Sequence, residues 1–202
     1  MNRFSTLTFV KLLALVALSC GGGGQVSSEE QARRAYVGLD KAVGKSMQLG
    51  FDGFSSASSA NISPQTASGM KSGTLTVTGQ VDQGASANKG MRLKVDMAGY
   101  SDGDVTVDGG SSVPITYATI DGGTQPTLDL SLKNIPNGTF TGTLVGDFEM
   151  SGGLTGSVKL DLSMSGAIED GGSGKVQRKA GGTTVTGKAT SGTGVFQVNI
   201  TL

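Results

Sequence analysis

The chain of 202 residues contains no histidine, no tryptophan and a single cysteine. Histidine is the commonest general base and a frequent metal ligand, so its absence excludes Ser-His-Asp triads and histidine-based metal sites. One cysteine can form neither an internal disulfide nor a zinc cluster. We therefore expect a protein that is not an enzyme and that needs no cofactor and no metal ion.

Charge of either sign is scarce and balanced, with 16 basic and 16 acidic side chains. Domains that bind nucleic acid normally carry a basic excess, so we expect no nucleic-acid partner. Glycine is abundant, with 34 residues, but it lacks the three-residue period of collagen. The length fits one domain with a short tether.

Long hydrophobic runs are also missing. The amino terminus reads MNRFSTLTFVKLLALVALSC, with Arg3 and Lys11 ahead of a short apolar stretch that ends at Leu18. That stretch is far shorter than the ~20 residues that cross a bilayer. The basic start, the apolar stretch and the small residue before Cys20 resemble the signal peptide of bacterial lipoproteins. The resemblance implies that residues 1–19 are removed and that the Cys20 sulfur carries a diacylglycerol.

An ordinary secretory signal is the competing interpretation, because Ala17-Leu18-Ser19 fits the small-x-small rule for soluble export. Export without lipidation would leave one reactive thiol in an oxidising compartment, whereas lipidation consumes it. Residues 20–26 form a predicted glycine-rich tether. Gly21 beside the cysteine resembles lipoproteins sorted to the outer membrane. We therefore expect a lipid-anchored protein of the cell envelope whose membrane contact is its amino-terminal lipid.

Residues 27–44 are predicted to form a helix. Either Ser27 with Glu30 or Ser28 with Gln31 would cap its start. Four apolar residues recur at helical spacing on one face, and Gly44 is a plausible stop. These four are Ala32, Tyr36, Leu39 and Val43. Beyond Gly44 the apolar residues Met47, Leu49 and Phe51 alternate, which predicts a first strand, and residues 55–73 show no period and are predicted to be a long loop.

From Thr74 to the end, apolar and polar residues alternate between turns such as Asn137-Gly138. Alternation gives each strand one buried and one wet face, which is typical of antiparallel sheets. We therefore predict a mainly β fold: an antiparallel meander forming a curved sheet, a sandwich or a partly open barrel, with one N-terminal helix. Residues 27–202 would be a single domain. The alternating segments are 75–81, 91–97, 105–107, 115–117, 128–132, 140–150, 158–164 and 196–202.

Several motifs invite a functional interpretation, and a structural one is simpler for each. Residues 182–189, GTTVTGKA, match a phosphate-binding loop except that alanine replaces the magnesium-binding hydroxyl, and the neighbouring residues predict a strand. A calcium loop is suggested by Asp102, Asp104 and Asp108, but these residues fail the EF-hand pattern and fit hairpin turns. A pair of catalytic carboxylates could be sought among Asp147, Glu149 and Asp161, but they lie on polar strand positions. A solvated loop is the simpler interpretation of the basic residues Lys175, Arg178 and Lys179.

Two functions remain open at this point. The first is a non-catalytic envelope lipoprotein that acts as a structural or interaction module. The second is a carrier of a hydrophobic ligand such as a lipid, held in a β half-barrel, by loose analogy with periplasmic lipid-carrying lipoproteins. In that case adaptable methionine side chains would line the cavity. The candidates on inward-facing positions are Met91, Met97, Met150 and Met164.

Overall fold

The computed structural model describes residues 24–202, so the signal peptide and Cys20 lie outside the described residues. The described part contains one long helix and eleven strands. Their bounds are α1 Glu29–Ser56, β1 Asn61–Ser68, β2 Ser72–Val81, β3 Lys89–Ser101, β4 Asp104–Val105, β5 Val113–Thr119, β6 Thr127–Lys133, β7 Thr139–Gly152, β8 Gly156–Gly172, β9 Lys175–Arg178, β10 Thr184–Ser191 and β11 Gly194–Thr201.

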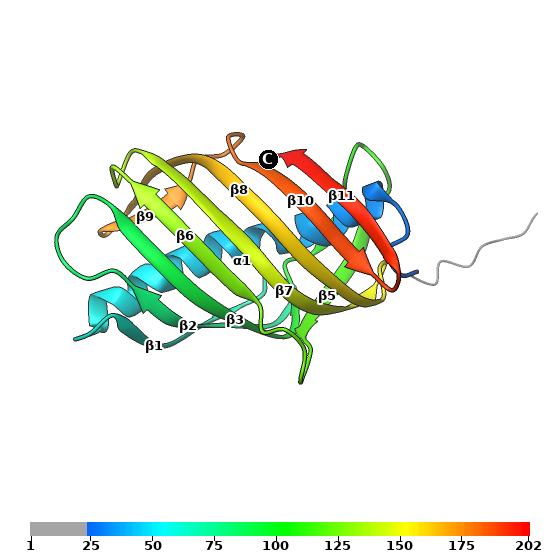
Figure 1. Cartoon of the computed structure of the whole chain (residues 1–202), viewed down its shortest axis with the longest axis horizontal. Helices are drawn as coiled ribbons and strands as arrows, with labels where there is room; N and C mark the ends of the chain where they lie inside the picture. Colours follow the sequence, from blue (N-terminus) through cyan, green and yellow to red (C-terminus); the bar gives the residue numbers. More distant parts are fainter. Residues whose placement is uncertain (1–23) are drawn as a thin grey trace, which may run out of the picture.

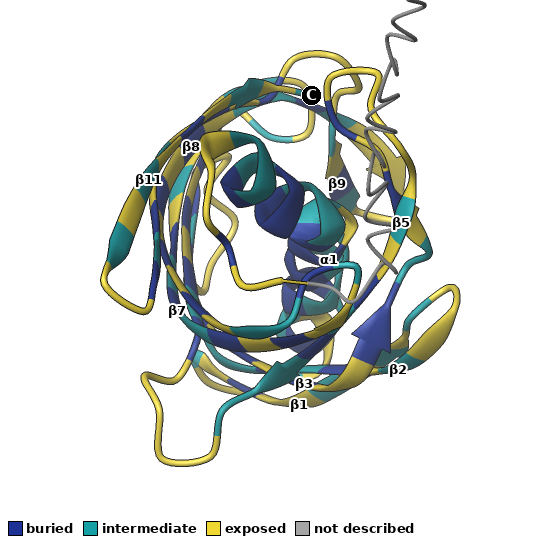
Figure 2. Cartoon of the chain, turned by 90° about the vertical axis from the view of Figure 1, so that its right-hand side faces the viewer, coloured by how far each residue is buried: buried dark blue, intermediate teal, exposed yellow. Residues whose placement is uncertain are grey.

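All eleven strands belong to one antiparallel sheet that curves around the helix (Figures 1 and 2). Its main path is β1-β2-β3-β5-β7-β8-β10-β11. β5 and β6 share one position in this path, because each pairs with a different stretch of β3 and of β7. The predicted fold class, an antiparallel curved sheet with one N-terminal helix, is therefore confirmed.

The helix is longer than predicted. It begins after Ser28, whose side chain accepts a hydrogen bond from the Gln31 amide at 3.2 Å, as the second of the two predicted caps requires. It does not end at Gly44 but continues to Ser56, so the strand predicted around Met47 is wrong. Met47 and Phe51 are four residues apart and continue the buried face of the helix. Burial against the sheet outweighs the low helix propensity of the glycines that interrupt this segment.

The predicted loop over residues 55–73 is also corrected, because β1 lies within it and pairs with β2. Ile62 is the one fully buried hydrophobic side chain of β1. An edge strand that buries so little has no reason to alternate, so its sequence looks like a loop. Backbone pairing with β2, rather than apolar burial, holds it in the sheet.

The folded body starts within the predicted tether. Gly24 forms an isolated bridge with Leu154, and its carbonyl accepts a hydrogen bond from the Thr155 amide at 3.1 Å. Val26 is 3% exposed. The last residues of the segment 20–26 therefore belong to the domain. No helix within residues 24–202 is long and apolar enough to cross a membrane.

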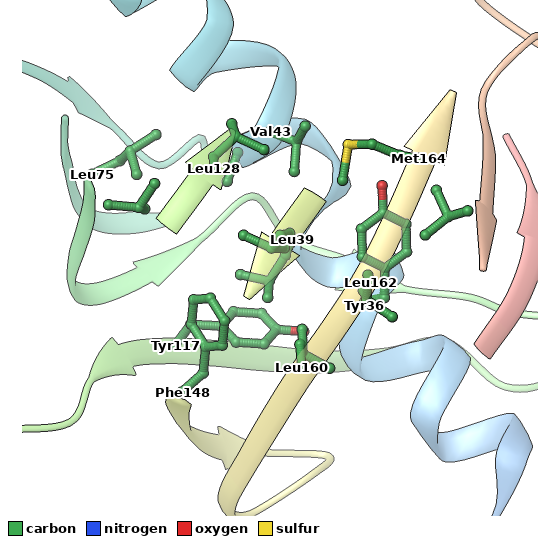
Figure 3. Packing of buried hydrophobic residues seen from close by; sticks show 14 of the residues in the cluster. Tyr36, Leu39, Val43, Leu75, Tyr117, Leu128, Phe148, Leu160, Leu162 and Met164 are labelled. Carbon is green, nitrogen blue, oxygen red and sulfur yellow. The ribbon is translucent and has the colours of Figure 1, made fainter. Parts of the chain in front are cut away.

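The core lies between the helix and the concave face of the sheet. Tyr36, Leu39 and Val43 of α1 point toward side chains of β2 and β5–β8, which point back toward the helix (Figure 3). Strands at opposite ends of the sheet therefore bury their inner side chains on the same helix. The helix takes the place that a ligand would take in an open half-barrel.

Candidate functional site

The space between helix and sheet is nearly filled. The cavity there has a volume of about 10 Å³ and is lined by side chains such as Leu39, Val43 and Phe148. One ordered water needs about that much room, and a lipid acyl chain needs far more. A hydrophobic ligand could enter only if α1 moved away from the sheet.

The four methionines proposed as ligand-lining residues are all buried in this core, with exposed fractions between 1% and 5%. Met97 touches the small cavity, whereas Met91 and Met164 lie under a groove on the opposite, outer side of the sheet. Met150 borders neither of these two spaces. The structure thus distributes the four side chains over the core and does not gather them around one site.

An ion pair fastens the middle of the helix to β9. Arg178 donates from Nη1 and Nη2 to the two carboxylate oxygens of Asp40 at 2.7 and 2.8 Å, and Nη2 also reaches the Asp40 carbonyl at 2.7 Å. Tyr36 donates to the same carboxylate at 2.9 Å. Burial alone would lower the pKa of Arg178, but the hydrogen bonds and charge of Asp40 outweigh it and raise that pKa. The pair stays charged and resists withdrawal of the helix.

A second cluster fastens the helix to the end of β3. Lys45 donates to Asp102 at 2.5 Å, and the Met70 amide donates to the same carboxylate oxygen at 2.9 Å. Tyr100 donates to the other oxygen. Burial by itself would raise the pKa of Asp102, but these hydrogen bonds outweigh it and lower the pKa below its usual range. The Asp102 side chain is 6% exposed and the Lys45 side chain 24%, so the carboxylate is the more deeply buried partner.

Further contacts hold both ends of the helix. Near its start, Arg34 pairs with Glu30 and donates to the carbonyls of Val105 and Ser111, and Arg33 pairs with Asp108. Near its end, Lys175 pairs with Asp52 at 2.5 Å. The helix is therefore anchored along its length as well as packed, which favours a fixed element over a mobile one.

Other motifs singled out in the sequence have structural places. Residues 184–189 of the phosphate-loop match lie in β10, a strand, as predicted. Asp102 and Asp108 pair with different helix residues, and no three acidic or cysteine side chains in residues 24–202 gather closely enough to hold a metal ion. Glu149 and Asp161 are exposed on the outer face. The basic segment is not a solvated loop, because Lys175 and Arg178 belong to β9 and face helix carboxylates.

A wide hollow lies on the outer, convex face of the sheet and was not predicted. It is a shallow groove of about 630 Å³ over β3, β6, β7, β8 and β10. Two rows of exposed side chains cross it at right angles to the strands. One row is Arg92, Asp129, Thr143, Ser163 and Thr186, and the other is Ser131, Thr141, Ser165 and Thr184.

Most of the side chains that line the groove are polar, and few are charged. Arg92 and Asp129 are the charged residues in its lining, and Arg92 is already paired with Asp82 at 2.8 Å. The hydrogen bond from Arg92, helped by the Gly90 amide, lowers the pKa of Asp82.

Besides these two charged residues, Gly142 and the apolar residues Met91, Leu130 and Met164, the lining consists of serines and threonines. Their hydroxyls lie on neighbouring strands, about 4.8 Å apart across the sheet and about 7 Å apart along a strand. Each hydroxyl can both donate and accept a hydrogen bond. The arrangement can hold a neutral partner that forms hydrogen bonds. The sequence feature that could have indicated this groove is the presence of serine and threonine at alternate positions of three strands. Comparison of the chain with protein-family models, with curated proteins and with solved structures finds no match.

Proposed function

We propose that this chain is a non-catalytic lipoprotein of the cell envelope, anchored in the outer membrane through lipid on Cys20, which acts as a structural or interaction module through the outer face of its sheet. The observation that carries the proposal is the filled interior. The helix occupies the concave face, and about 10 Å³ remains between helix and sheet. Contact with other molecules is therefore left to the outside.

The chemistry of the outer face supports an interaction role. The groove offers hydroxyl groups in two ordered rows and little net charge. Such a surface can exchange its hydrogen bonds with water for hydrogen bonds with a neutral polar partner, and a neutral hydroxyl costs far less to desolvate than a charged group. Its rigid sheet keeps the rows in a fixed register.

The anchor is tested by replacing Cys20 with serine. We expect the Cys20→Ser chain to lose membrane fractionation and detergent partitioning, because the sulfur that would carry the lipid is gone. An unchanged distribution between membrane and soluble fractions would remove the anchor from the proposal.

The filled interior is tested by native mass spectrometry of the chain extracted from its host membranes. We expect covalent lipid on Cys20 and no non-covalent lipid in the folded body. A non-covalent lipid present at one copy per chain would contradict the proposal and would favour the carrier function.

The interaction surface is tested by site-specific photo-cross-linking in intact cells. A photoreactive amino acid replaces Ser163, which lies in the groove, or Ser157, an exposed serine on the same strand and the same face outside it. We expect defined adducts from position 163 and not from position 157. Equal adducts from both positions, or none from position 163, would argue against the groove.

A further inference from the structure

The last strand of the sheet has one unpaired side. β11 pairs with β10 through eight consecutive residues, and no other strand in residues 24–202 pairs with it (Figure 1). Thr183 and Leu202 exchange two backbone hydrogen bonds, at 2.9 and 2.8 Å. In an antiparallel ladder the direction of the backbone groups alternates. The groups that point away from β10 are therefore those of Val195, Gln197, Asn199 and Thr201.

This edge lacks the devices that usually prevent strand pairing. Residues 194–202, GVFQVNITL, contain no charged residue and no proline, and the pairing with β10 has no bulge. The opposite edge, β1, contains Pro64 and a register shift between Ile62 and Gln65. Natural sheets protect free edges with charges, prolines and bulges. One edge of this sheet is thus protected and the other is open.

The open edge also leaves apolar surface in water. Val195 is 57% exposed, although it is a large hydrophobic side chain. Phe196, Ile200 and Leu202 face inward and pack against the core but stay partly exposed. A strand added beside β11 would cover these side chains and satisfy the outward backbone groups together.

We propose that β11 pairs with β11 of a second copy of this chain, antiparallel, about a twofold axis that passes midway between the two Val198 residues. In this register Val195 lies opposite Thr201 of the other copy, and Gln197 lies opposite Asn199, each pair occurring twice. These are the residues whose backbone groups point outward, so every such pair can exchange two hydrogen bonds. The two sheets join into one continuous sheet.

Self-pairing is favoured by the pattern of β11 itself. Antiparallel pairing about Val198 places Phe196 against Ile200 on the inner face and Gln197 against Asn199 on the outer face, so apolar meets apolar and amide meets amide. No like charges meet, because the strand has none. A head-to-tail filament through β1 is disfavoured by Pro64. The twofold arrangement closes on itself and ends as a dimer.

The inference goes beyond the proposed function, since neither Cys20 nor the groove takes part in it. Its first test is sedimentation velocity of the full chain in mild detergent. The edge variant is Gln197→Lys with Asn199→Lys, which places lysines opposite each other across the dimer. The control is Ser151→Lys with Ser157→Lys, which adds the same charge to exposed positions of β7 and β8, away from the edge and outside the groove.

We expect the wild-type chain and the control to form dimers. In the edge variant two pairs of lysines would repel each other across the dimer, so we expect its dissociation constant to rise at least about tenfold. A monomeric wild-type chain overturns the proposal, and so does an equal dissociation constant for edge variant and control. Circular dichroism of each variant shows that the sheet is intact.

The register is tested by disulfide trapping in chains whose Cys20 is replaced with serine. Residues 197 and 199 of the two copies would have Cα atoms about 5.5 Å apart, within disulfide range, whereas two residues 197 would lie about 7–8 Å apart. Mixing Gln197→Cys with Asn199→Cys should therefore give far more linked dimer than either variant alone. Equal linkage in all three samples, or none in the mixture, overturns this pairing.

Discussion

Gly38 tests whether the fit between helix and sheet controls stability. An added Cβ at this position would lie 2.1 Å from the Tyr117 hydroxyl oxygen and 2.9 Å from the ring carbon that carries it. Tyr117 is 1% exposed, and its hydroxyl donates to the Ala35 carbonyl at 2.9 Å. Gly38→Ala must therefore push a buried ring out of place. Gly44, on the same helix, is the matched control, since its added Cβ would meet nothing closer than Arg178 at 3.7 Å.

The two substitutions share one favourable contribution and differ in their costs. Replacing glycine by alanine inside a helix gains about 1 kcal/mol. At position 38 overpacking costs about 1–3 kcal/mol, and displacing the buried tyrosine hydroxyl from its acceptor costs about 1–3 kcal/mol more. We expect Gly38→Ala to lower the free energy of unfolding by about 1–5 kcal/mol, and Gly44→Ala to raise it by up to about 1 kcal/mol.

Urea unfolding followed by far-ultraviolet circular dichroism measures both changes. The slope against urea should stay the same, so that a shift of midpoint reports stability. In a domain of this size each kcal/mol corresponds to about 2–4 °C in melting temperature, which gives a second measurement. The reasoning is refuted if Gly38→Ala is as stable as the wild-type chain, or if both variants change stability equally.

Three further outcomes follow from the buried polar groups. Asp40→Ala should lower the free energy of unfolding, measured by urea titration, by about 3 kcal/mol, because it leaves the buried Arg178 guanidinium without its carboxylate partner. Replacing both Asp40 and Arg178 with leucine should lower it less, and an equal loss in the two variants would count against the ion pair. The pKa of Asp102 is lower in the folded chain, so its contribution is present above about pH 4 and lost as pH falls through the folded pKa; the stability gap to Asp102→Asn should close in acid, and a gap independent of pH would argue otherwise. Burial is the main reason that the pKa values of all three tyrosines are raised, so their contribution to stability is present below about pH 10 and is lost at higher pH. The absorbance of tyrosinate should therefore rise in one step, together with unfolding. A separate rise near pH 10 in the folded chain would contradict this. The three are Tyr36, Tyr100 and Tyr117.

The antiparallel sheet could be predicted from local pattern. Alternation over segments such as residues 158–164 leaves only one arrangement with a buried and a wet face, and the turn residues between segments mark where the chain reverses. The start of the helix could be predicted for the same reason, since the hydrogen bond from the Gln31 amide to the Ser28 side chain spans a single turn. Interactions between residues close in sequence were sufficient for these features.

The end of the helix and the first strand could not be predicted from local pattern. Gly44, Gly50 and Gly53 weaken a helix in isolation, and only the sheet shows why Gly50 and Gly53 are there. An added Cβ at Gly53 would lie 2.7 Å from the Ile62 Cβ, so a small residue lets helix and edge strand approach closely. The pairing of Arg178 with Asp40 joins residues 138 positions apart and has no local signal.

From the sequence alone, the missing histidine argues against histidine-based triads and metal sites, and the lone cysteine indicates where an anchor would lie. The alternation determined that an antiparallel sheet would form. Only the tertiary structure decided that the sheet's interior is occupied by its own helix, that hydroxyl rows from several strands share one groove, and that β11 is an open edge. Each of these depends on which strands become neighbours, and neighbourhood is set by the packing of residues far apart in the chain.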